Sequence, residues 1–349
     1  MKDLSLLQPK KILVRMPNWI GDFVMATAVL KDLRDKFPQA EITAMCKTSL
    51  SPLLLHDPSV NEVFGFKNTK RFFFRRDTQN NIRKALNTGS YDIGILLTNS
   101  FSSAWWLWQG GVKYRLGYVG NYRSILLTHR LRFPEEREDQ HLTLTYKQLL
   151  GPLGIVPSST APELTVTDKE LKKAYTKLSK HGIFPHHTLI GINPGAAYGS
   201  AKCWPPERFR SVASLLLEKD SNIRIVFFAD GAGVSLVNTI CLGMPPGVVN
   251  LAGQTNLREL MASIKLCHAL LTNDSGPMHL ADALGVPLVA LFGSTNPITT
   301  GPFKQRSQVI QKKVDCSPCY KRTCPIDFRC MTGISPEEVF KKLQRLLNL

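Results

Sequence analysis

Three short segments combine polar side chains with small residues directly after an apolar run, and the first is Trp19-Ile20-Gly21-Asp22. It follows the buried-strand pattern of residues 10–16. Gly21 allows a tight backbone turn, which predicts Asp22 at the N-terminus of the next helix. A carboxylate there could act as a general base toward an acceptor hydroxyl. The alternative is that Asp22 is only a helix N-cap, which stabilises the helix by about 1 kcal/mol.

The second segment, residues 193–205, contains a run of small residues followed by a lysine. Small residues such as Gly195 and Ala196 let backbone N–H groups approach a phosphate, and Lys202 adds a positive charge. The segment lacks the Gly-Lys-Ser/Thr ending of a Walker A loop and the Gly-x-Gly-x-x-Gly dinucleotide pattern. It therefore predicts either a diphosphate site or an exposed lysine on a mobile loop.

The third segment, residues 273–281, again follows a strand pattern and opens a helix. We expect Asp274 and Ser275 at the helix cap, Gly276 to permit close approach, and His279 to lie one turn further on the same side. The first-turn N–H groups and the positive helix end can hold a phosphate. A well-capped helix with a buried histidine is the alternative.

The eight cysteines fall into a scattered and a clustered set. Four scattered ones are expected to be buried, reduced thiols: Cys46, Cys203, Cys241 and Cys267. The cluster Cys316, Cys319, Cys324 and Cys330 permits a tetrahedral zinc site but lacks two matched Cys-x-x-Cys pairs. Reduced structural thiols are the default expectation, and no metal is assigned to the site.

Strand and helix patterns alternate along the chain, which predicts an α/β fold with parallel sheets. The alternation starts again near residue 188, so two doubly wound domains are expected to face each other across a cleft. We predict a first domain over residues 1–160, a helix-bearing linker over 161–185, a second domain over 186–333 and a final helix over 334–349.

Length, composition and charge agree with this organisation. A chain of 349 residues with 43% hydrophobic and 20% charged residues suits two globular domains. The net charge of +17 favours anionic partners such as nucleic acid, an anionic membrane or phosphorylated substrates. Residues 67–84 concentrate basic side chains around Phe72-Phe73-Phe74, which suits contact with lipid headgroups, although a solvated loop is the simpler interpretation. No long apolar run or signal peptide is evident, so a cytoplasmic location is expected.

Taken together, these segments resemble the heptosyltransferases of glycosyltransferase family 9, and the ADP-heptose:lipopolysaccharide heptosyltransferase II group most closely. The resemblance is carried by residues 17–22, 194–205, 273–279, 293–297 and 316–330. It implies a GT-B fold with two Rossmann-like domains and an inverting transfer that needs no metal or other cofactor. The donor would be ADP-heptose, and the acceptor a heptose on the lipopolysaccharide inner core (lipid A-Kdo-heptose).

The resemblance also implies roles for individual residues. Asp22 is the expected catalytic base and Lys202 the cation that neutralises the leaving diphosphate. The expected donor-binding residues are Gly195, Ala196, Lys202, Asp274, Ser275, Gly276 and His279. The expected acceptor-binding residues are Arg15, Asn18, Trp19, Gly21 and Arg71. The same reasoning places the enzyme on the anionic inner face of the inner membrane as a peripheral protein.

Other functions remain open from the sequence. The chain departs from the family pattern at Ala197 and Cys203, where relatives often carry Glu and a basic residue, which leaves room for another donor or acceptor. A heptosyltransferase of the first or third step, another GT-B transferase, and a non-catalytic ADP-sugar binder are alternatives. A basic nucleic-acid-binding protein would show an aromatic and basic stripe or a recognition helix, and neither is evident, so we expect no nucleic-acid partner.

Overall fold

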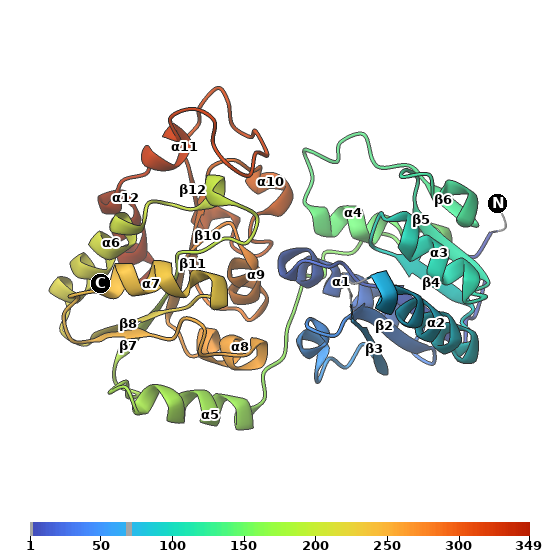
Figure 1. The fold of residues 1–349 in the computed structure, drawn as a ribbon, viewed down its shortest axis with the longest axis horizontal. Helices are drawn as coiled ribbons and strands as arrows, with labels where there is room; N and C mark the ends of the chain where they lie inside the picture. Colours follow the sequence, from blue (N-terminus) through green and yellow to red (C-terminus); the bar gives the residue numbers. More distant parts are fainter. Residues whose placement is uncertain (1–2, 68–71) are drawn as a thin grey trace. The chain divides into compact units, whose positions relative to one another are not determined.

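The computed structural model describes residues 3–67 and 72–349, which divide into two compact units, Met1–Thr165 and Val166–Leu349. The first unit runs from blue to green in Figure 1, and the second from light green to red. Each unit contains a six-stranded sheet in which all paired strands are parallel. The predicted α/β class with two doubly wound sheets is therefore confirmed.

The first unit is built on a sheet of order β3-β2-β1-β4-β5-β6. Its strands are β1 (Lys11–Arg15), β2 (Glu41–Lys47), β3 (Glu62–Phe66), β4 (Ile93–Leu96), β5 (Tyr114–Tyr118) and β6 (His129–Leu131). Its helices are α1 (Ile20–Lys36), α2 (Phe72–Gly89), α3 (Phe101–Gln109) and α4 (Leu142–Gln148), with short 3₁₀ turns at Ser51–Leu54, Ser124–Leu126 and Gly151–Leu153.

Apolar side chains fix the helices of this unit against the sheet. Leu13 of β1 packs in one buried cluster with Leu86 of α2 and Leu107 of α3. Helix α1 packs against α4. Because side chains of a strand alternate between its faces, Ile12 and Val14 are buried on the opposite face from Leu13.

The loop interpretation of the basic segment 67–84 is wrong from Phe72 onward, because α2 begins there. Ile82 and Leu86 are four residues apart and both are buried, so they form the apolar stripe that holds this helix on the core. Arg83 and Lys84 are exposed. Arg71 lies outside the described residues.

The second unit is built on a sheet of order β12-β11-β10-β7-β8-β9. Its strands are β7 (Thr188–Asn193), β8 (Ile223–Phe227), β9 (Val248–Asn250), β10 (Ala269–Asn273), β11 (Leu288–Phe292) and β12 (Val309–Gln311). Its helices are α5 (Asp168–Ser179), α6 (Pro206–Lys219), α7 (Val234–Cys241), α8 (Leu257–Lys265), α9 (Gly276–Ala283), α10 (Pro297–Thr300), α11 (Arg329–Thr332) and α12 (Pro336–Leu347). Short 3₁₀ turns lie at Ser200–Lys202, Gly231–Gly233 and Arg306–Gln308.

The strand order of the second unit determines which loops meet. Strands β7 and β10 are hydrogen-bonded neighbours, and Asn193 is in register with Thr272. The loops that follow Asn193 and Asn273 therefore begin side by side at the carboxyl edge of the sheet, where ligands of α/β folds bind. The final helix α12 packs on α6, and the buried Trp204 indole donates a hydrogen bond to the Ile334 carbonyl at 3.1 Å.

Candidate active site

In the first unit, the end of β1 carries a buried arginine. The Arg15 side chain donates to the Met16 carbonyl and, through Nη2, to Asn18 Oδ1 at 2.8 Å. Its guanidinium lies over the Phe66 ring, 4.7 Å from the centroid. Burial lowers the pKa of Arg15 to about 10, so the side chain remains charged at neutral pH. The structure therefore brings Arg15 and Asn18 together, whereas Trp19 is 53% exposed.

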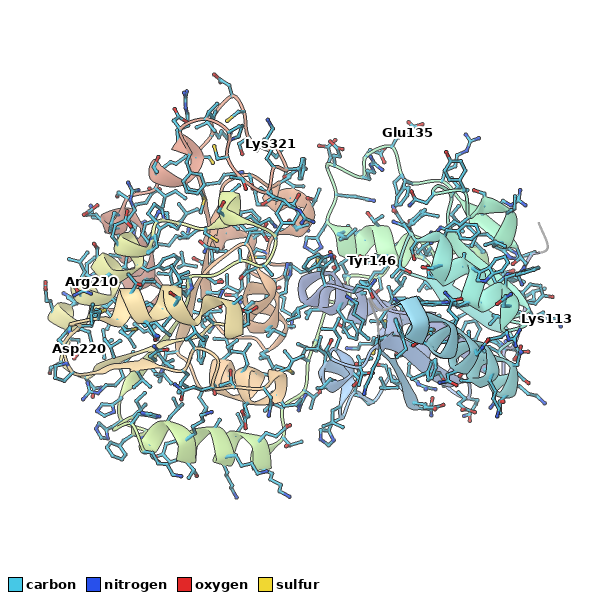
Figure 2. All side chains as sticks on the ribbon, in the orientation of Figure 1. Lys113, Glu135, Tyr146, Arg210, Asp220 and Lys321 are labelled. Atoms are coloured by element: carbon cyan, nitrogen blue, oxygen red, sulfur yellow. The ribbon has the colours of Figure 1, made fainter. Side chains whose placement is uncertain are left out.

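Asp22 lies in the first turn of α1, but it is not the helix N-cap. The cap is Trp19, whose side chain makes no capping hydrogen bond, so the N-cap interpretation of Asp22 is wrong. Gly21 is the second residue of the helix and not a left-handed turn residue. Asp22 is half-buried. Burial and, secondarily, the charge of Asp22 raise the pKa of Tyr146 on α4 (Figure 2).

In the second unit, two asparagines join the neighbouring loops. Asn193 Nδ2 donates to the Gly195 carbonyl at 3.0 Å and to Ser275 Oγ at 3.2 Å. Asn273 Nδ2 donates to the Pro194 carbonyl at 2.7 Å, and its Oδ1 accepts from the Trp204 N–H at 3.1 Å. These bonds hold both small-residue loops in a fixed arrangement.

Lys202 is held within this arrangement by a carboxylate. Its Nζ lies 2.5 Å from Asp274 Oδ2, which also accepts from Thr295 Oγ1 at 2.6 Å. The Lys202 ammonium lies 4.8 Å from the centroid of the Tyr198 ring. The Lys202 and Asp274 side chains are only 13% and 5% exposed. Lys202 is therefore not an exposed lysine on a mobile loop.

The start of α9 completes this edge of the second unit. The N-cap is Ser275, and its side chain makes no capping hydrogen bond. Its hydroxyl lies 3.1 Å from Thr272 Oγ1 instead. Gly276 is the first helical residue, and His279 is buried one turn further. The Ser275 side chain therefore does not cap α9, while Pro277 has no N–H and the Met278 N–H donates to the Ser275 carbonyl at 3.2 Å. The Gly276 N–H and the positive helix end are what this turn could offer to an anion.

Comparisons with known proteins decide the family. The model of glycosyltransferase family 9 (heptosyltransferase) matches residues 80–328. The chain belongs to this family. It is 30% identical to lipopolysaccharide heptosyltransferase 2 of Escherichia coli K12, over 97% of this chain and 98% of that protein. The structure of E. coli ADP-heptose LPS heptosyltransferase II matches with a TM-score of 0.81 at 29% identity, covering 97% of this chain and 98% of that one. A family 9 glycosyltransferase from Veillonella parvula matches with a TM-score of 0.86 at 26% identity, covering 99% of both chains.

The two doubly wound units are therefore those of a GT-B glycosyltransferase, as the resemblance implied. Sequence reasoning did not single out Thr295 or Tyr198, which contact Asp274 and Lys202. Thr295 lies in the Gly-Ser-Thr-x-Pro turn at residues 293–297, so a signal for it was present. Gly199 has a φ of +157°, and a Cβ there would lie 2.3 Å from the Arg322 carbonyl oxygen. Gly199 thus lets the loop that carries Lys202 contact residues 316–330, the segment of this family 9 enzyme that carries the four clustered cysteines.

The four clustered cysteines differ in burial: Cys316 is exposed, Cys319 and Cys324 are half-buried, and Cys330 is buried. Burial and then the charges of Cys316, Cys324 and Cys319 raise the pKa of Cys330. All four are free thiols. Across residues 3–67 and 72–349, no group of three or more His, Cys, Asp or Glu side chains is placed to hold a metal ion. These residues therefore offer no ready ligand set for the zinc alternative.

None of the described helices is long and apolar enough to cross a bilayer.

Proposed function

We propose that this family 9 enzyme transfers L-glycero-D-manno-heptose from ADP-heptose to a heptose of the lipopolysaccharide inner core, with inversion at the anomeric carbon. The names of its relatives supply the substrates, since the E. coli protein is a lipopolysaccharide heptosyltransferase 2. The observation that carries the proposal is the Lys202, Asp274 and Thr295 cluster beside the start of α9. It combines a positioned cation with backbone N–H groups, as the diphosphate of a sugar nucleotide requires.

On the donor side, Lys202 neutralises charge on the diphosphate as the glycosidic bond breaks. Ser275 and Gly276 present the first turn of α9 to a phosphate, and the loop at Gly195 and Ala196 leaves room for close backbone approach. A Cβ at Gly195 would have no heavy atom within 4 Å. Asp274 holds Lys202 in place and can accept hydrogen bonds from sugar hydroxyls. His279, buried one turn further along α9, is the remaining proposed donor contact.

On the acceptor side, Asp22 is the catalytic base. The acceptor hydroxyl oxygen forms a bond to the anomeric carbon while its proton moves to the Asp22 carboxylate. The bond from the anomeric carbon to the diphosphate oxygen breaks, and ADP leaves with that electron pair. Lys202 and the helix end supply the positive charge that the leaving group needs. The proposed acceptor contacts are Arg15, Asn18, Trp19, Gly21 and Arg71.

We further propose that the enzyme works as a peripheral protein on an anionic membrane surface in the cytoplasm. The described part of the basic segment supports contact with lipid headgroups, because Lys67, Arg83 and Lys84 are exposed. Liposomes containing anionic lipid should bind wild-type protein more tightly than an Arg83→Ser, Lys84→Ser variant. The variant Lys172→Ser, Lys173→Ser on α5 is a charge-matched control. Equal binding of the wild type and the Arg83/Lys84 variant would reject this docking surface.

The first experiment on the reaction measures transfer from ADP-heptose to a monoheptosylated inner-core acceptor, with wild type beside Asp22→Asn. Asn keeps the size of the side chain but cannot take the proton. We expect normal donor binding and turnover at least about 100-fold slower in the variant. Equal turnover by the variant would remove Asp22 from the base role.

The same assay separates the alternative functions. A panel of sugar nucleotides and acceptors distinguishes a heptosyltransferase of another step or another GT-B transferase. A non-catalytic ADP-sugar binder would bind the donor without any transfer. Salt-dependent binding of DNA without affinity for an ADP-sugar would point to a nucleic-acid-binding protein.

A further inference from the structure

Helix α3 carries apolar side chains on two sides, although the first unit covers only one of them. Ala104 and Leu107 are fully buried against the core. Phe101, Trp105 and Trp108 follow one another at intervals of four and three residues, so they share a second stripe of the helix. Phe101 and Trp108 are 42% and 46% exposed. An apolar stripe is normally covered, and the described part of the first unit leaves this one in contact with solvent.

The three rings of this stripe, Phe101, Trp105 and Trp108, form the aromatic face of α3. The Phe101 and Trp105 rings stack with their centroids 6.0 Å apart, and the Trp105 and Trp108 centroids are 5.0 Å apart. Trp105 is half-buried and packs against the core of the unit, so it holds the two outer rings in place. A partner would therefore meet rings that are already ordered, which lowers the entropic cost of binding.

A turn after β5 adds exposed side chains beside the start of α3. Arg123 is fully buried and donates through Nη2 to Asn99 Oδ1 at 2.9 Å, two positions before α3 begins. The 3₁₀ turn that follows, Ser124–Leu126, packs against α3. Tyr122 is 93% exposed, and Ile125 is exposed as well. The apolar surface thus continues past the N-terminal end of the aromatic face.

Cationic side chains border this surface. Residues 93–134, which include α3 and the turn after β5, contain no Asp or Glu. Helices α2 and α3 lie side by side (Figure 1), and Asn87 of α2 borders the end of α3, since a Cβ at Gly111 would lie 3.3 Å from Asn87 Oδ1. Arg83 and Lys84 are exposed and lie one helical turn before Asn87. The charge beside the aromatic face is therefore complementary to an anionic surface.

We propose that the aromatic face of α3 inserts into the headgroup region of an anionic lipid bilayer and holds the first unit on that surface. Tryptophan and tyrosine favour this region because each combines an apolar ring with a polar N–H or O–H group. The neighbouring basic side chains favour anionic lipid. Three partly exposed rings, each of about 150–250 Å² in full, offer less than the roughly 800 Å² per partner of a stable protein interface.

This inference rests on the proposed membrane location and adds an apolar contact to the basic one. Helix α3 follows β4 and begins at the carboxyl edge of the sheet, where ligands of α/β folds bind. Docking of α3 on lipid therefore keeps this edge of the first unit close to a membrane-bound acceptor.

Vesicle sedimentation of the full-length protein tests the proposal, with vesicles of phosphatidylcholine and the anionic lipid phosphatidylglycerol. The double variant Phe101→Ser, Trp108→Ser should bind these vesicles about tenfold more weakly than wild type, because binding strength scales with the apolar area inserted. The matched control is Phe184→Ser, Leu242→Ser, which removes two exposed apolar side chains from the second unit and should bind as wild type does.

Salt separates the aromatic contact from the basic one. At about 1 M salt the screening length falls to about 3 Å, so the Arg83→Ser, Lys84→Ser variant should approach wild type. The Phe101→Ser, Trp108→Ser variant should remain weaker than both. Tyr122→Asn is a second test, because Asn readily adopts the φ of +57° found there, and it should weaken binding a fewfold.

Two outcomes would overturn the proposal. In the first, Phe101→Ser, Trp108→Ser and Tyr122→Asn both bind vesicles as tightly as wild type. In the second, the wild type forms dimers in sedimentation velocity, and Phe101→Ser, Trp108→Ser abolishes them without changing vesicle binding. A second copy of the chain would then be what covers the aromatic face.

The transfer assay keeps this proposal distinct from the proposed function. With the acceptor embedded in vesicles, Phe101→Ser, Trp108→Ser should raise the KM for the acceptor. With the same acceptor freed of its acyl chains, the variant should match wild type in both kcat and KM. An equal loss on both forms of the acceptor would reject the lipid contact. A wild type that transfers nothing to the deacylated acceptor would refute the proposed function, while vesicle binding would still decide the role of α3.

Discussion

Lys202 Nζ and Asp274 Oδ2 lie 2.5 Å apart although 72 positions separate the two residues in the chain. The pair forms because β7 and β10 are neighbouring strands whose loops begin together. Thr295 donates to the same carboxylate oxygen at 2.6 Å. The lysine charge that an ADP-sugar would meet is therefore partly balanced by the protein itself.

This pairing predicts opposite effects of two substitutions. Lys202→Met should lower kcat by about 100-fold or more, since it removes a positioned cation from the leaving group. Asp274→Asn should tighten ADP binding, because the lysine is no longer balanced by a carboxylate, while kcat falls as Lys202 loses its fixed position. ADP affinity from calorimetry and transfer rates measure the two effects.

Thr295→Val is the control for the second substitution. It removes one hydrogen bond to Asp274 but leaves both charges, so ADP affinity should change little. An Asp274→Asn variant that binds ADP more weakly than wild type would contradict the charge-balancing role and favour direct contact of Asp274 with the donor.

A second ion pair lies in the interior of the first unit. Lys147 Nζ is 3.2 Å from Asp32 Oδ2, and the side chains are 0% and 3% exposed. Ser158 Oγ also donates to Asp32, at 2.7 Å. Asp32→Ala should destabilise the protein by about 3–5 kcal/mol because it leaves a buried ammonium without its partner. Urea unfolding followed by circular dichroism measures this loss.

The double variant Asp32→Leu, Lys147→Met removes both charges. It should be more stable than Asp32→Ala, because no unpaired charge remains buried. If the double variant is instead as unstable as the sum of Asp32→Leu and Lys147→Met, each measured alone, the pair contributes through packing rather than through charge.

The sequence predicted the parts of the fold whose signals are local. Continuous apolar runs are typical of buried parallel strands, and they predicted β1, β7 and β10. The small-residue segments follow these strands directly. The short strands β3, β6 and β12 were not predicted. In the five residues Glu62–Phe66, apolar and polar side chains alternate too weakly to distinguish a strand from a loop. Pairing with β2 determines the conformation of this segment.

The candidate site was predicted in the same uneven way. Asp22 and Lys202 lie in compact sequence segments that a reader can recognise. Their partners depend on pairing across long distances in the chain, as with Thr295 at Asp274 and Phe66 at Arg15. The cap of α1 is Trp19, three positions before Asp22, for which the N-cap role was the alternative interpretation; helix ends are the least reliable feature of sequence patterns.

The cysteines should differ widely in reactivity. Burial raises the pKa of Cys46 to about 12, and it also raises the pKa of the buried Cys267. Cys316 is exposed. In the native protein at pH 8, a disulfide reagent should therefore modify Cys316 rapidly and Cys46 and Cys267 only after unfolding, since the thiolate is the reactive form. Cys316→Ser should remove a fast phase that Cys46→Ser leaves intact, and a fast phase that survives Cys316→Ser would disprove this assignment.

The pairing of Glu170 with Arg258 predicts an acid-sensitive contribution to the stability of the second unit. Arg258 Nε and Nη2 donate to the two carboxylate oxygens of Glu170 at 2.7 and 2.6 Å, which joins α5 to α8. These bonds lower the pKa of Glu170 from 4.5 to about 2. Because the pKa is lower in the folded protein, the stabilisation is fully present above about pH 4.5 and is lost as the pH falls toward 2.

Glu170→Gln isolates this charge, since glutamine keeps an oxygen that can accept from Thr167 at the start of α5. The variant should be less stable than wild type by about 1–2 kcal/mol at pH 7, a value reduced for solvent screening of a partly exposed pair. The difference in unfolding free energy should shrink between pH 4.5 and 2, because protonation removes the same charge from the wild type. Glu218→Gln on the exposed surface of α6 is the control and should follow wild type at every pH. A Glu170→Gln deficit that stays constant down to pH 2 would show that the substitution acts through packing and not through the carboxylate charge.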